Sequence, residues 1–278
     1  MNAEKITRAS KSNLALAFVA LGRERRQDIT VFYAFCRVID DIADATETGP
    51  EQKRIALADW RRWIREAAAG EPTLAGDVRG LYAKYAIWPE MLDEIIDGVE
   101  MDLGVVRYAS FEDLRLYCYR VASAVGLISI EIFGYRNRAC REYAVELGLA
   151  LQVTNIIRDV GKDLASDRVY LPTEDMARFH YSEEDLSARR YDDAFVSLLE
   201  FEAERAEVYF SRAAALLPPE DRRSMVAAEI MASVYRTLLR RMRADRFRVF
   251  EKEYKLSKIE KGGRVARQLL RLFLNAGR

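Results

Sequence analysis

Apolar residues recur every three or four positions through most of the chain, and the alternation that strands show is scarce. Ala, Leu, Arg and Glu, which favour helices, dominate these stretches. The prolines fall between them, where helices begin or end. The pattern predicts an all-α protein with helices at about 10–21, 24–46, 51–69, 74–86, 89–103, 111–134, 138–165, 183–189, 192–216, 220–250 and 255–275.

The stretch 115–160 is apolar on nearly all sides in places, which is typical of helices buried at the centre of a bundle. Small residues within it leave room for close helix packing or for a ligand, namely Ala122, Ser123, Ala124 and Gly126. No Gly/Ser linker, low-complexity tract or short repeat divides the chain. We therefore expect a single helical domain over residues 1–278.

The balance of charge excludes some classes of partner. The 278 residues include 44 basic and 44 acidic side chains, so no single-sign field points to nucleic acid. The N-terminus lacks the apolar core of a signal peptide, and no uninterrupted apolar run approaches the roughly 20 residues that span a bilayer. We expect a cytoplasmic protein, either free or peripheral to the inner face of the cell membrane, and either a monomer or a dimer.

Cysteine and histidine usage limits the chemistry. Cys36, Cys118 and Cys140 are far apart and odd in number, which argues against a disulfide framework and a cysteine-based zinc site. His180 is the only histidine, and its polar surroundings predict a surface position. The chemistry is therefore expected to depend on carboxylates, arginines, tyrosines and metal ions.

The first acidic motif lies in FYAFCRVIDDIADAT, residues 32–46. On a helix its polar residues share one side, because they are spaced by four, three, one and three: Tyr33, Arg37, Asp40, Asp41 and Asp44. Three carboxylates within five residues repel one another, and one arginine offsets only part of that repulsion. The spacing therefore favours a bound cation.

The second acidic motif lies in LQVTNIIRDVGKD, residues 151–163. Its polar residues step by three, four and four along one face of an otherwise apolar helix: Gln152, Asn155, Asp159 and Asp163. Polar groups within a bundle need partners. Two such stripes that face each other across an apolar bundle predict a metal site.

The ligand types indicate which metal is bound. Carboxylate and amide oxygens without histidine or cysteine select hard cations, Mg²⁺ first and Mn²⁺ second. Mg²⁺ is commonly shared between one or two carboxylates and phosphate oxygens, so a diphosphate substrate is implied. Neither motif has the spacing of a calcium-binding EF-hand loop. Each motif alone would also suit a solvated helix face, whereas the two together favour metal binding.

These residues resemble a known family. DDIAD in YAFCRVIDDIAD, and NIIRDVGKD followed by DRVYLP, are similar to the two signatures of the squalene and phytoene synthases, and YCYRVASAVGL resembles that family's central helix. The resemblance covers about residues 8–250, in the family's order. Terpene cyclases share the first motif but differ in the second, so head-to-head condensation is favoured over cyclisation. The implied fold is the class I isoprenoid synthase bundle with a central cavity.

The resemblance also implies roles for individual residues. Two or three Mg²⁺ ions would be held on one side by Asp40, Asp41 and Asp44, and on the other by Asn155, Asp159 and Asp163. The diphosphates or the adjacent prenyl carbons would contact Tyr33, Arg37, Gln152 and Arg158. A diphosphate-binding loop is expected at Ser10, Lys11, Ser12 and Asn13, although the family usually has serine where Asn13 stands. Arg168, Tyr170 and Tyr235 complete the expected site.

The expected reaction is Mg²⁺-dependent 1'-2-3 condensation of two prenyl diphosphates. Positive charge from the metal and from Lys11, Arg37 and Arg158 would stabilise the departing diphosphate. The second prenyl double bond would attack the allylic cation, and loss of a proton would close a cyclopropane. Tyr33, Tyr119 and the released diphosphate are alternative bases.

The substrate length is predicted from one residue. Phe18 resembles the bulky residue that many farnesyl-using members carry near the cavity floor, which favours farnesyl over geranylgeranyl diphosphate. The product would be presqualene diphosphate, squalene or dehydrosqualene, as in bacterial members, and squalene would require NADPH. The alternatives are a phytoene synthase that uses geranylgeranyl diphosphate, a prenyl diphosphate phosphatase, and a non-catalytic assembly factor of the same fold.

The C-terminal stretch alternates Arg with Val, Leu and Phe at helical spacing, in KGGRVARQLLRLFLNAGR. Such a helix over about 255–278 would contact an anionic membrane or pack on the bundle.

Overall fold

The computed structural model describes Ala3, residues 17–104 and residues 106–275, and these residues form helices and no β-strand. The elements in chain order are η1 (Phe18–Ala20), α3 (Arg23–Asp44), α4 (Pro50–Trp63), α5 (Thr73–Tyr82), α6 (Pro89–Glu100), η2 (Met101–Leu103), α7 (Phe111–Cys118), η3 (Tyr119–Ser123), α8 (Ala124–Phe133), α9 (Ala139–Leu164), α10 (Thr173–Arg178), α11 (Glu183–Ser187), α12 (Asp193–Leu216), η4 (Pro219–Asp221), α13 (Val226–Ala244) and α14 (Lys258–Asn275). The all-α prediction is confirmed.

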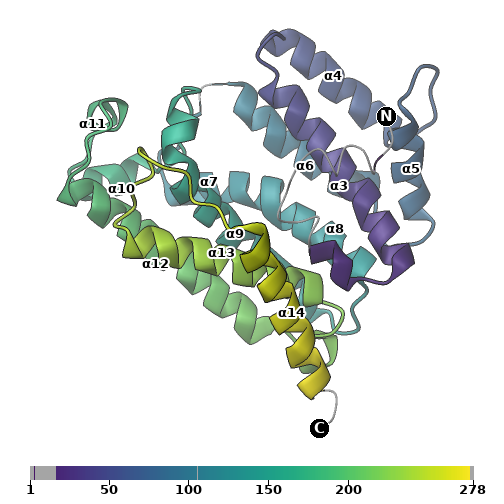
Figure 1. Ribbon diagram of the computed structural model, residues 1–278. Helices are drawn as coiled ribbons and strands as arrows, with labels where there is room; N and C mark the ends of the chain where they lie inside the picture. The colour runs from purple at the N-terminus through teal and green to yellow at the C-terminus, as the bar shows by residue number, and fades with distance from the viewer. Residues whose placement is uncertain (1–2, 4–16, 105, 276–278) are drawn as a thin grey trace.

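A central helical column organises the bundle. The α7 helix, the π-helical turn η3 and the α8 helix follow one another in the chain, and α3 and α6 pack against this column (Figure 1). The α9 helix also packs against the column and is covered in turn by α12 and α13. The two helices that carry the acidic motifs, α3 and α9, therefore both contact the central column.

The α3 helix is positioned by its apolar face. Ile29, Phe32 and Ile39 are almost fully buried, at intervals that keep them on one side of the helix. The carboxylates of Asp40 and Asp44 lie along the edge of this buried face, and both are accessible to solvent. Burial of one face thus turns the first acidic motif toward the open side.

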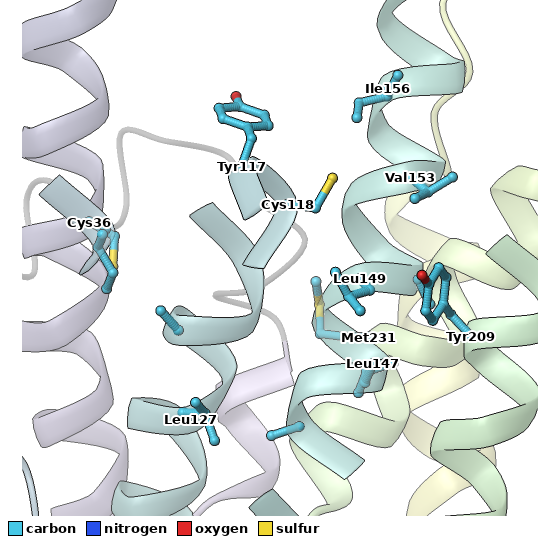
Figure 2. Close-up of a cluster of buried hydrophobic side chains, with 14 of the residues drawn as sticks. Cys36, Tyr117, Cys118, Leu127, Leu147, Leu149, Val153, Ile156, Tyr209 and Met231 are labelled. Carbon is cyan, nitrogen blue, oxygen red and sulfur yellow. The ribbon is translucent and has the colours of Figure 1, made fainter. Parts of the chain in front are cut away.

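The core runs continuously between the central column and α9. Figure 2 shows Tyr117 and Cys118 at the end of α7, with Val153 and Ile156 on the facing side of α9. All four residues are buried, at 9% exposure or less. The three cysteines are free, and Cys36, Cys118 and Cys140 are all buried.

The π-helical turn η3 is pressed between two glycines. A Cβ atom on Gly98 of α6 would lie 2.7 Å from the Cβ of Arg120, and one on Gly148 of α9 would lie 2.6 Å from the Cα of Ser123. Single π-turns inside helices occur often at functional sites. The sequence predicted one continuous helix over 111–134, and the structure shows that a π-turn interrupts it.

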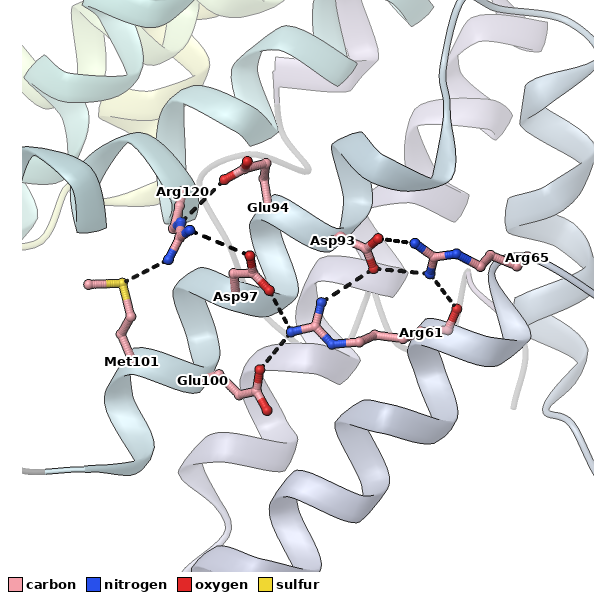
Figure 3. A network of polar contacts seen from close by, with 8 residues as sticks. All are labelled: Arg61, Arg65, Asp93, Glu94, Asp97, Glu100, Met101 and Arg120. Atoms are coloured by element: carbon pink, nitrogen blue, oxygen red, sulfur yellow. Dashed lines mark hydrogen bonds and ion pairs between the residues drawn. The ribbon is translucent and has the colours of Figure 1, made fainter.

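An ion-pair network holds α4 and η3 onto α6 (Figure 3). Arg61 donates to Asp97 and to Glu100 at 2.6 Å each, and Arg120 donates to Glu94 at 3.2 Å. Because α6 continues into η2, this network also sets the position of the short turn that contains Asp102.

The predicted elements differ from the observed ones at several ends. The α10 helix was not predicted, and the helix expected over 220–250 is shorter, because it forms only over Val226–Ala244. Beyond it, Arg246 and Phe247 adopt left-handed backbone conformations, with φ of 51° and 55°, which end the helix. The chain then crosses to α14 without helix, and we call residues 245–257 the strap. The helix expected at 10–21 lies mostly outside the described residues.

One helical stretch of the described chain, Phe111–Phe133, is long and apolar enough to cross a membrane. Half of its most apolar window is buried inside the bundle, as a core helix requires. Its interruption by charged Arg115 and Arg120 explains why no unbroken apolar run is seen in the sequence.

The α14 helix packs on α13 in front of the bundle (Figure 1). Arg241 pairs with Glu260, and Arg264 donates to the hydroxyl of Ser233 at 2.9 Å. Ile259 and Leu270 remain exposed. Membrane contact through this helix stays a prediction.

Candidate active site

The first acidic motif occupies the last two turns of α3. Arg37 pairs with Asp41 at 2.5 Å, one helical turn further on. Asp40, Asp41 and Asp44 are all exposed by more than a third of their surface. One arginine therefore faces three accessible carboxylates, so the motif carries excess negative charge.

A long-range ion pair joins this motif to the segment that follows α9. Arg168 donates from Nη1 to Oδ1 of Asp44 at 3.1 Å. Arg168 lies five residues after Asp163, the last residue of the second motif. The backbone N–H of Arg168 donates to the carbonyl oxygen of Asp163 at 2.9 Å, so Arg168 links the first motif to the end of the second.

The second acidic motif lines one face of α9. Arg158 holds Asp159 with two hydrogen bonds, at 2.9 and 2.5 Å. The amide nitrogen of Asn155 donates to the amide oxygen of Gln152 at 3.3 Å. The Asn155 Oδ1 atom is buried and has no hydrogen-bond partner within the described part of the chain. A buried oxygen in that state is ready to accept a ligand.

The surroundings raise the pKa of one carboxyl group in each motif. The Asp40 side chain is accessible, but protein surrounds it on most sides, and the resulting desolvation raises its pKa to about 7. Desolvation likewise raises the pKa of Asp163 to about 7, and the charge of Asp159 adds to this effect. The negative charge of Asp102 contributes to the raised pKa of both Asp40 and Asp163, so Asp102 interacts electrostatically with both motifs.

Asp102 is the site residue that the sequence reading missed. It accepts hydrogen bonds from Tyr170 at 2.7 Å and from Tyr117 at 3.0 Å, and the two tyrosine rings stack with centroids 5.0 Å apart. Desolvation raises the pKa of Asp102, and the hydrogen bond from Tyr170 opposes this shift. Asp102 stands alone between Met101 and Leu103 and is not part of a spaced motif. The only indication in the sequence that it has a special role is that both neighbours are apolar.

An apolar cavity lies beside the central column. Its walls come from η1, η3, α8, α9 and α13, and they include Phe18, Ala122, Gly126, Gly148 and Met231. Phe18 is buried and meets the ring of Tyr33 edge to face, at 6.0 Å between centroids. Small residues of the central column thus form part of the cavity wall. The sequence predicted that they leave room either for close helix packing or for a ligand, and here they border an open space.

The other predicted residues lie in separate places. Ser10, Lys11, Ser12 and Asn13 lie outside the described residues. Tyr235 lines a second cavity together with Arg158, next to the second motif. Tyr119 begins the π-turn, whereas its neighbour Tyr117 is the tyrosine that joins the Asp102 network. His180 is exposed, as predicted.

The donor set suits Mg²⁺ shared with a substrate. Among residues 3, 17–104 and 106–275, no three His, Cys, Asp or Glu side chains lie close enough to hold a metal ion by themselves. Mg²⁺ needs few protein ligands, because waters and phosphate oxygens complete its octahedron. Carboxylates at Asp40, Asp44 and Asp159, and the unpartnered oxygen of Asn155, are donors of the type that Mg²⁺ prefers.

Known proteins share this sequence and fold. Residues 7–260 match the squalene/phytoene synthase family. The chain is 34% identical over 265 residues to the 15-cis-phytoene synthase of Synechococcus elongatus, covering 89% of this chain and 85% of that one. It is 33% identical over 259 residues to the presqualene diphosphate synthase of Zymomonas mobilis, covering 91% and 88%.

Solved structures agree with this relationship. The fold superposes on a dehydrosqualene synthase with a TM-score of 0.83 and 27% identity, covering 97% of this chain and 95% of that one. A squalene synthase from Alicyclobacillus acidocaldarius follows with a TM-score of 0.79 and 26% identity, covering 88% and 93%. Phytoene synthases and presqualene diphosphate synthases are prenyltransferases. The chain belongs to the squalene/phytoene synthase family.

Proposed function

We propose that the protein joins two prenyl diphosphates head to head in a Mg²⁺-dependent reaction. The observation that carries the proposal is the ion pair between Asp44 of the first motif and Arg168, which follows the second motif, together with an apolar cavity lined by α9, the helix that bears the second motif. Carboxylates on two helices suit metal-bridged diphosphate, and a cavity with apolar walls suits a prenyl chain.

The metal would be held by Asp40, Asp41 and Asp44 on α3, and by Asn155, Asp159 and Asp163 on α9. When bound, Mg²⁺ supplies positive charge that stabilises the departing diphosphate. Arg37 and Arg158 add fixed positive charge beside the two motifs. Gln152 follows Leu151, which lines the apolar cavity, and Tyr33 contacts the ring of Phe18 in the cavity wall.

The chain's apolar groups would protect the reacting carbons. The C1–O bond of one allylic diphosphate breaks, and its electron pair leaves with the diphosphate. The C2=C3 double bond of the second substrate then forms a bond to C1, and loss of a proton closes the cyclopropane. The apolar walls of the cavity, Phe18 among them, would exclude water from the prenyl chains. Tyr33, Tyr119 and the released diphosphate stay alternative acceptors of the proton.

We further propose farnesyl diphosphate as the substrate. Phe18 narrows the apolar cavity from the side of η1, where a longer chain would need room. Relatives of both substrate classes have similar identity to this chain, at 34% and 33%, so the proposal depends on Phe18.

Product analysis tests the proposal. The purified protein is incubated with farnesyl or geranylgeranyl diphosphate and Mg²⁺, with and without NADPH, and the products are identified by mass spectrometry. Presqualene diphosphate or dehydrosqualene from the farnesyl substrate is expected, with squalene only if NADPH is used. Phytoene would overturn the choice of substrate. A prenyl alcohol alone would indicate a phosphatase, and no turnover of either substrate would indicate a non-catalytic protein.

A single substitution tests the proposed preference for the shorter prenyl chain. Phe18→Ala enlarges the cavity, so it is expected to raise use of geranylgeranyl diphosphate relative to farnesyl diphosphate. Val19→Ala is the matched control, because Val19 is the neighbouring residue and is 57% exposed. An unchanged preference in the Phe18 variant would argue against this residue as the limit on chain length.

A further inference from the structure

Arg107 joins three segments of the described chain, and the proposed function assigns it no role. Its Nη1 atom donates to the carbonyl oxygens of Val106 and Asp167, at 2.9 Å each. Nη2 donates to Oδ1 of Asp167 at 2.8 Å, and Nε donates to Oε1 of Glu183 at 2.6 Å. We call Arg107 and its two acidic partners the Arg107 clamp. The clamp connects the segment after η2 with the turn after α9 and with the first residue of α11.

The turn after α9 ends that helix without a glycine. The N–H of Asp167 donates to the carbonyl oxygen of Leu164 at 3.1 Å, and the N–H of Arg168 donates to that of Asp163 at 2.9 Å. This pair of bonds is the Schellman arrangement, in which the residue at the position of Asp167 has a left-handed backbone and is usually glycine. Asp167 has a φ of 55°. Because a residue with a Cβ atom adopts this conformation at a cost, contacts elsewhere must offset the strain.

The Arg107 clamp supplies such contacts at Asp167 itself. Arg107 binds both the carbonyl oxygen and the carboxylate of Asp167, so it fixes the backbone and the side chain of one residue together. Glu183 accepts from a third nitrogen of the same guanidinium and holds it in place. A guanidinium presents its donors in a rigid planar fork, so it fixes direction as well as distance. The clamp therefore favours the left-handed conformation of Asp167.

The position of Arg168 follows from this turn. Arg168 comes directly after Asp167 and forms a parallel β-bridge with Val106, and the N–H of Val169 donates to the carbonyl oxygen of Val106 at 3.1 Å. Val106 is 2% exposed, so the bridge is anchored in the core. From this backbone the Arg168 side chain reaches Asp44 at 3.1 Å. The backbone at Arg168 is thus held by α9 on one side and by residues 106 and 107 on the other.

We propose that Arg107 is a positioning residue for the condensation, because its clamp on Asp167 places Arg168 against the carboxylate of Asp44. The proposal rests on the proposed function, which supplies the reaction and includes Arg168 in its site. Within the described part of the chain, the hydrogen bonds of Arg107 reach no residue of either acidic motif. Arg107 therefore acts through Arg168. Misplacement of a site group by about 1 Å can lower a rate by roughly a hundredfold, even when its cause lies far from the reacting atoms.

A double-mutant cycle on the full chain separates action through Arg168 from a general loss of stability. Steady-state kinetics with Mg²⁺ and the prenyl diphosphate that the wild type condenses is measured for the wild type, Arg107→Ala, Arg168→Gln and the double variant. Arg107→Ala is expected to lower kcat/KM by roughly tenfold to a hundredfold. In the Arg168→Gln background the same change should cost less than about threefold, because no arginine remains to be positioned. Equal losses in both backgrounds would overturn the proposal.

Arg79→Ala is the matched control, since Arg79 makes a similar clamp at the loop that follows α4. Its guanidinium donates to the carbonyl oxygen of Glu66 at 3.2 Å and to the carboxylate of Glu71 at 2.6 and 2.8 Å. Arg79 and Arg107 are 19% and 28% exposed. Both alanine variants should show a lower melting temperature by circular dichroism, whereas kcat/KM of the control should stay within about twofold of the wild type. An equal loss of kcat/KM in the two variants would contradict a specific role of Arg107.

A glycine substitution tests whether the clamp acts on the turn. Glycine adopts a positive φ without steric cost, so the turn should form without the clamp in Arg107→Ala/Asp167→Gly. This double variant is expected to recover several-fold of the kcat/KM that Arg107→Ala loses. A loss of function caused by weaker folding elsewhere would not be repaired by this change. Failure of glycine to restore any activity would show that Arg107 does not act through the turn.

Limited digestion with trypsin tests the clamp without requiring turnover. Trypsin cleaves after arginine and lysine, and the bond between Arg168 and Val169 lies where the clamp holds the chain. Cleavage at this bond, identified by mass spectrometry of the fragments, should be faster in Arg107→Ala but not in Arg79→Ala, because local opening exposes it. Unchanged cleavage after Arg168 would refute the clamp. Absence of condensation by the wild type would refute the proposed function alone, because the digestion still decides whether Arg107 holds Arg168 in place.

Discussion

Arg168 reaches across 124 residues of sequence to donate to Asp44 at 3.1 Å, which joins the end of α3 to the segment after α9. The same guanidinium lowers the pKa of Asp102 and of Asp163, against the desolvation that raises both. One arginine thus offsets carboxylates from three segments of the chain. Mg²⁺ bound at Asp44 would take over part of this compensation.

Removing this arginine should make the protein depend on the metal for stability. Arg168→Gln is expected to lower the free energy of unfolding by about 1 kcal/mol in EDTA, because the ion pair is partly exposed and screened. Addition of Mg²⁺ should raise the melting temperature of this variant more than that of the wild type. Thermal unfolding with EDTA and with Mg²⁺ measures the difference.

The matched control is Arg115→Gln, which removes an exposed pair with Glu112 within a single helix. Its melting temperature should change little in either condition. An equal Mg²⁺ effect on the Arg168 variant and the wild type would contradict the idea that this arginine and the metal share one role.

The raised pKa values predict how stability depends on pH. Asp40 and Asp163 have a pKa of about 7 in the folded protein, compared with 3.8 for an ordinary aspartate. Between about pH 4 and 7 the folded state holds more protons on these groups than the unfolded state does, so their contribution to stability falls as pH rises. Without metal, the melting temperature should be higher at pH 5.5 than at pH 7.5.

Variants isolate these two groups from the other titrating residues. Asp40→Asn/Asp163→Asn should flatten the pH dependence, and Asp102→Asn should shift it to lower pH by removing a charge that raises both pKa values. Mg²⁺ displaces the protons, so its affinity should strengthen as pH rises toward about 7. An unchanged pH profile in the double variant would show that other groups cause it.

The sequence predicts much of this architecture for a physical reason. The polar faces of α3 and α9 interrupt apolar helices at regular spacing, so both motifs and their helices could be located before any fold was known. The apolar cavity shows that small residues such as Gly126 do leave space beside the central column. Each of these features depends on residues that are close together in the sequence, so the spacing of polar and apolar residues is enough to predict it.

The features that were missed depend on contacts between distant segments. The π-turn lies in a stretch that is apolar on nearly all sides. One additional residue in a turn therefore does not change the pattern of apolar and polar positions visibly. The glycines that leave room for it, Gly98 and Gly148, lie on two other helices. Asp102 is 68 residues from Tyr170, and no spacing rule connects them. The strap ends α13 early through left-handed residues that are not glycines.

A substitution at Asn155 can distinguish a role of this residue in metal binding from a role in the stability of the fold. Its Oδ1 atom is buried without a partner in the described chain, so replacing the amide by an apolar group of similar size removes a desolvated oxygen. Asn155→Leu should therefore unfold within about 1 kcal/mol of the wild type in EDTA. Its Mg²⁺ affinity should fall roughly tenfold or more, measured from the Mg²⁺ dependence of product formation.

Thr154→Val is a suitable control for this prediction, because Thr154 is the neighbouring residue and donates only within its own helix, to the carbonyl of Ala150 at 2.7 Å. It should leave Mg²⁺ affinity unchanged. A strong loss of stability in Asn155→Leu, with normal Mg²⁺ dependence, would show that the amide is structural.

A side chain at Gly161 should destabilise the protein, whereas a side chain at a glycine with no neighbouring atoms around its Cβ position should not. Alanine in a helix interior is favoured over glycine by about 1 kcal/mol, so Gly80→Ala in α5, where nothing lies within 4 Å, should stabilise the protein by up to that amount. Gly161→Ala should destabilise it instead, because the Cβ would press on the carbonyl of Val249 and displace the strap. Urea unfolding gives both free energies. Limited proteolysis should show faster cleavage within residues 245–257 in the Gly161 variant only, and a stabilised Gly161→Ala would mean that the strap moves aside without cost.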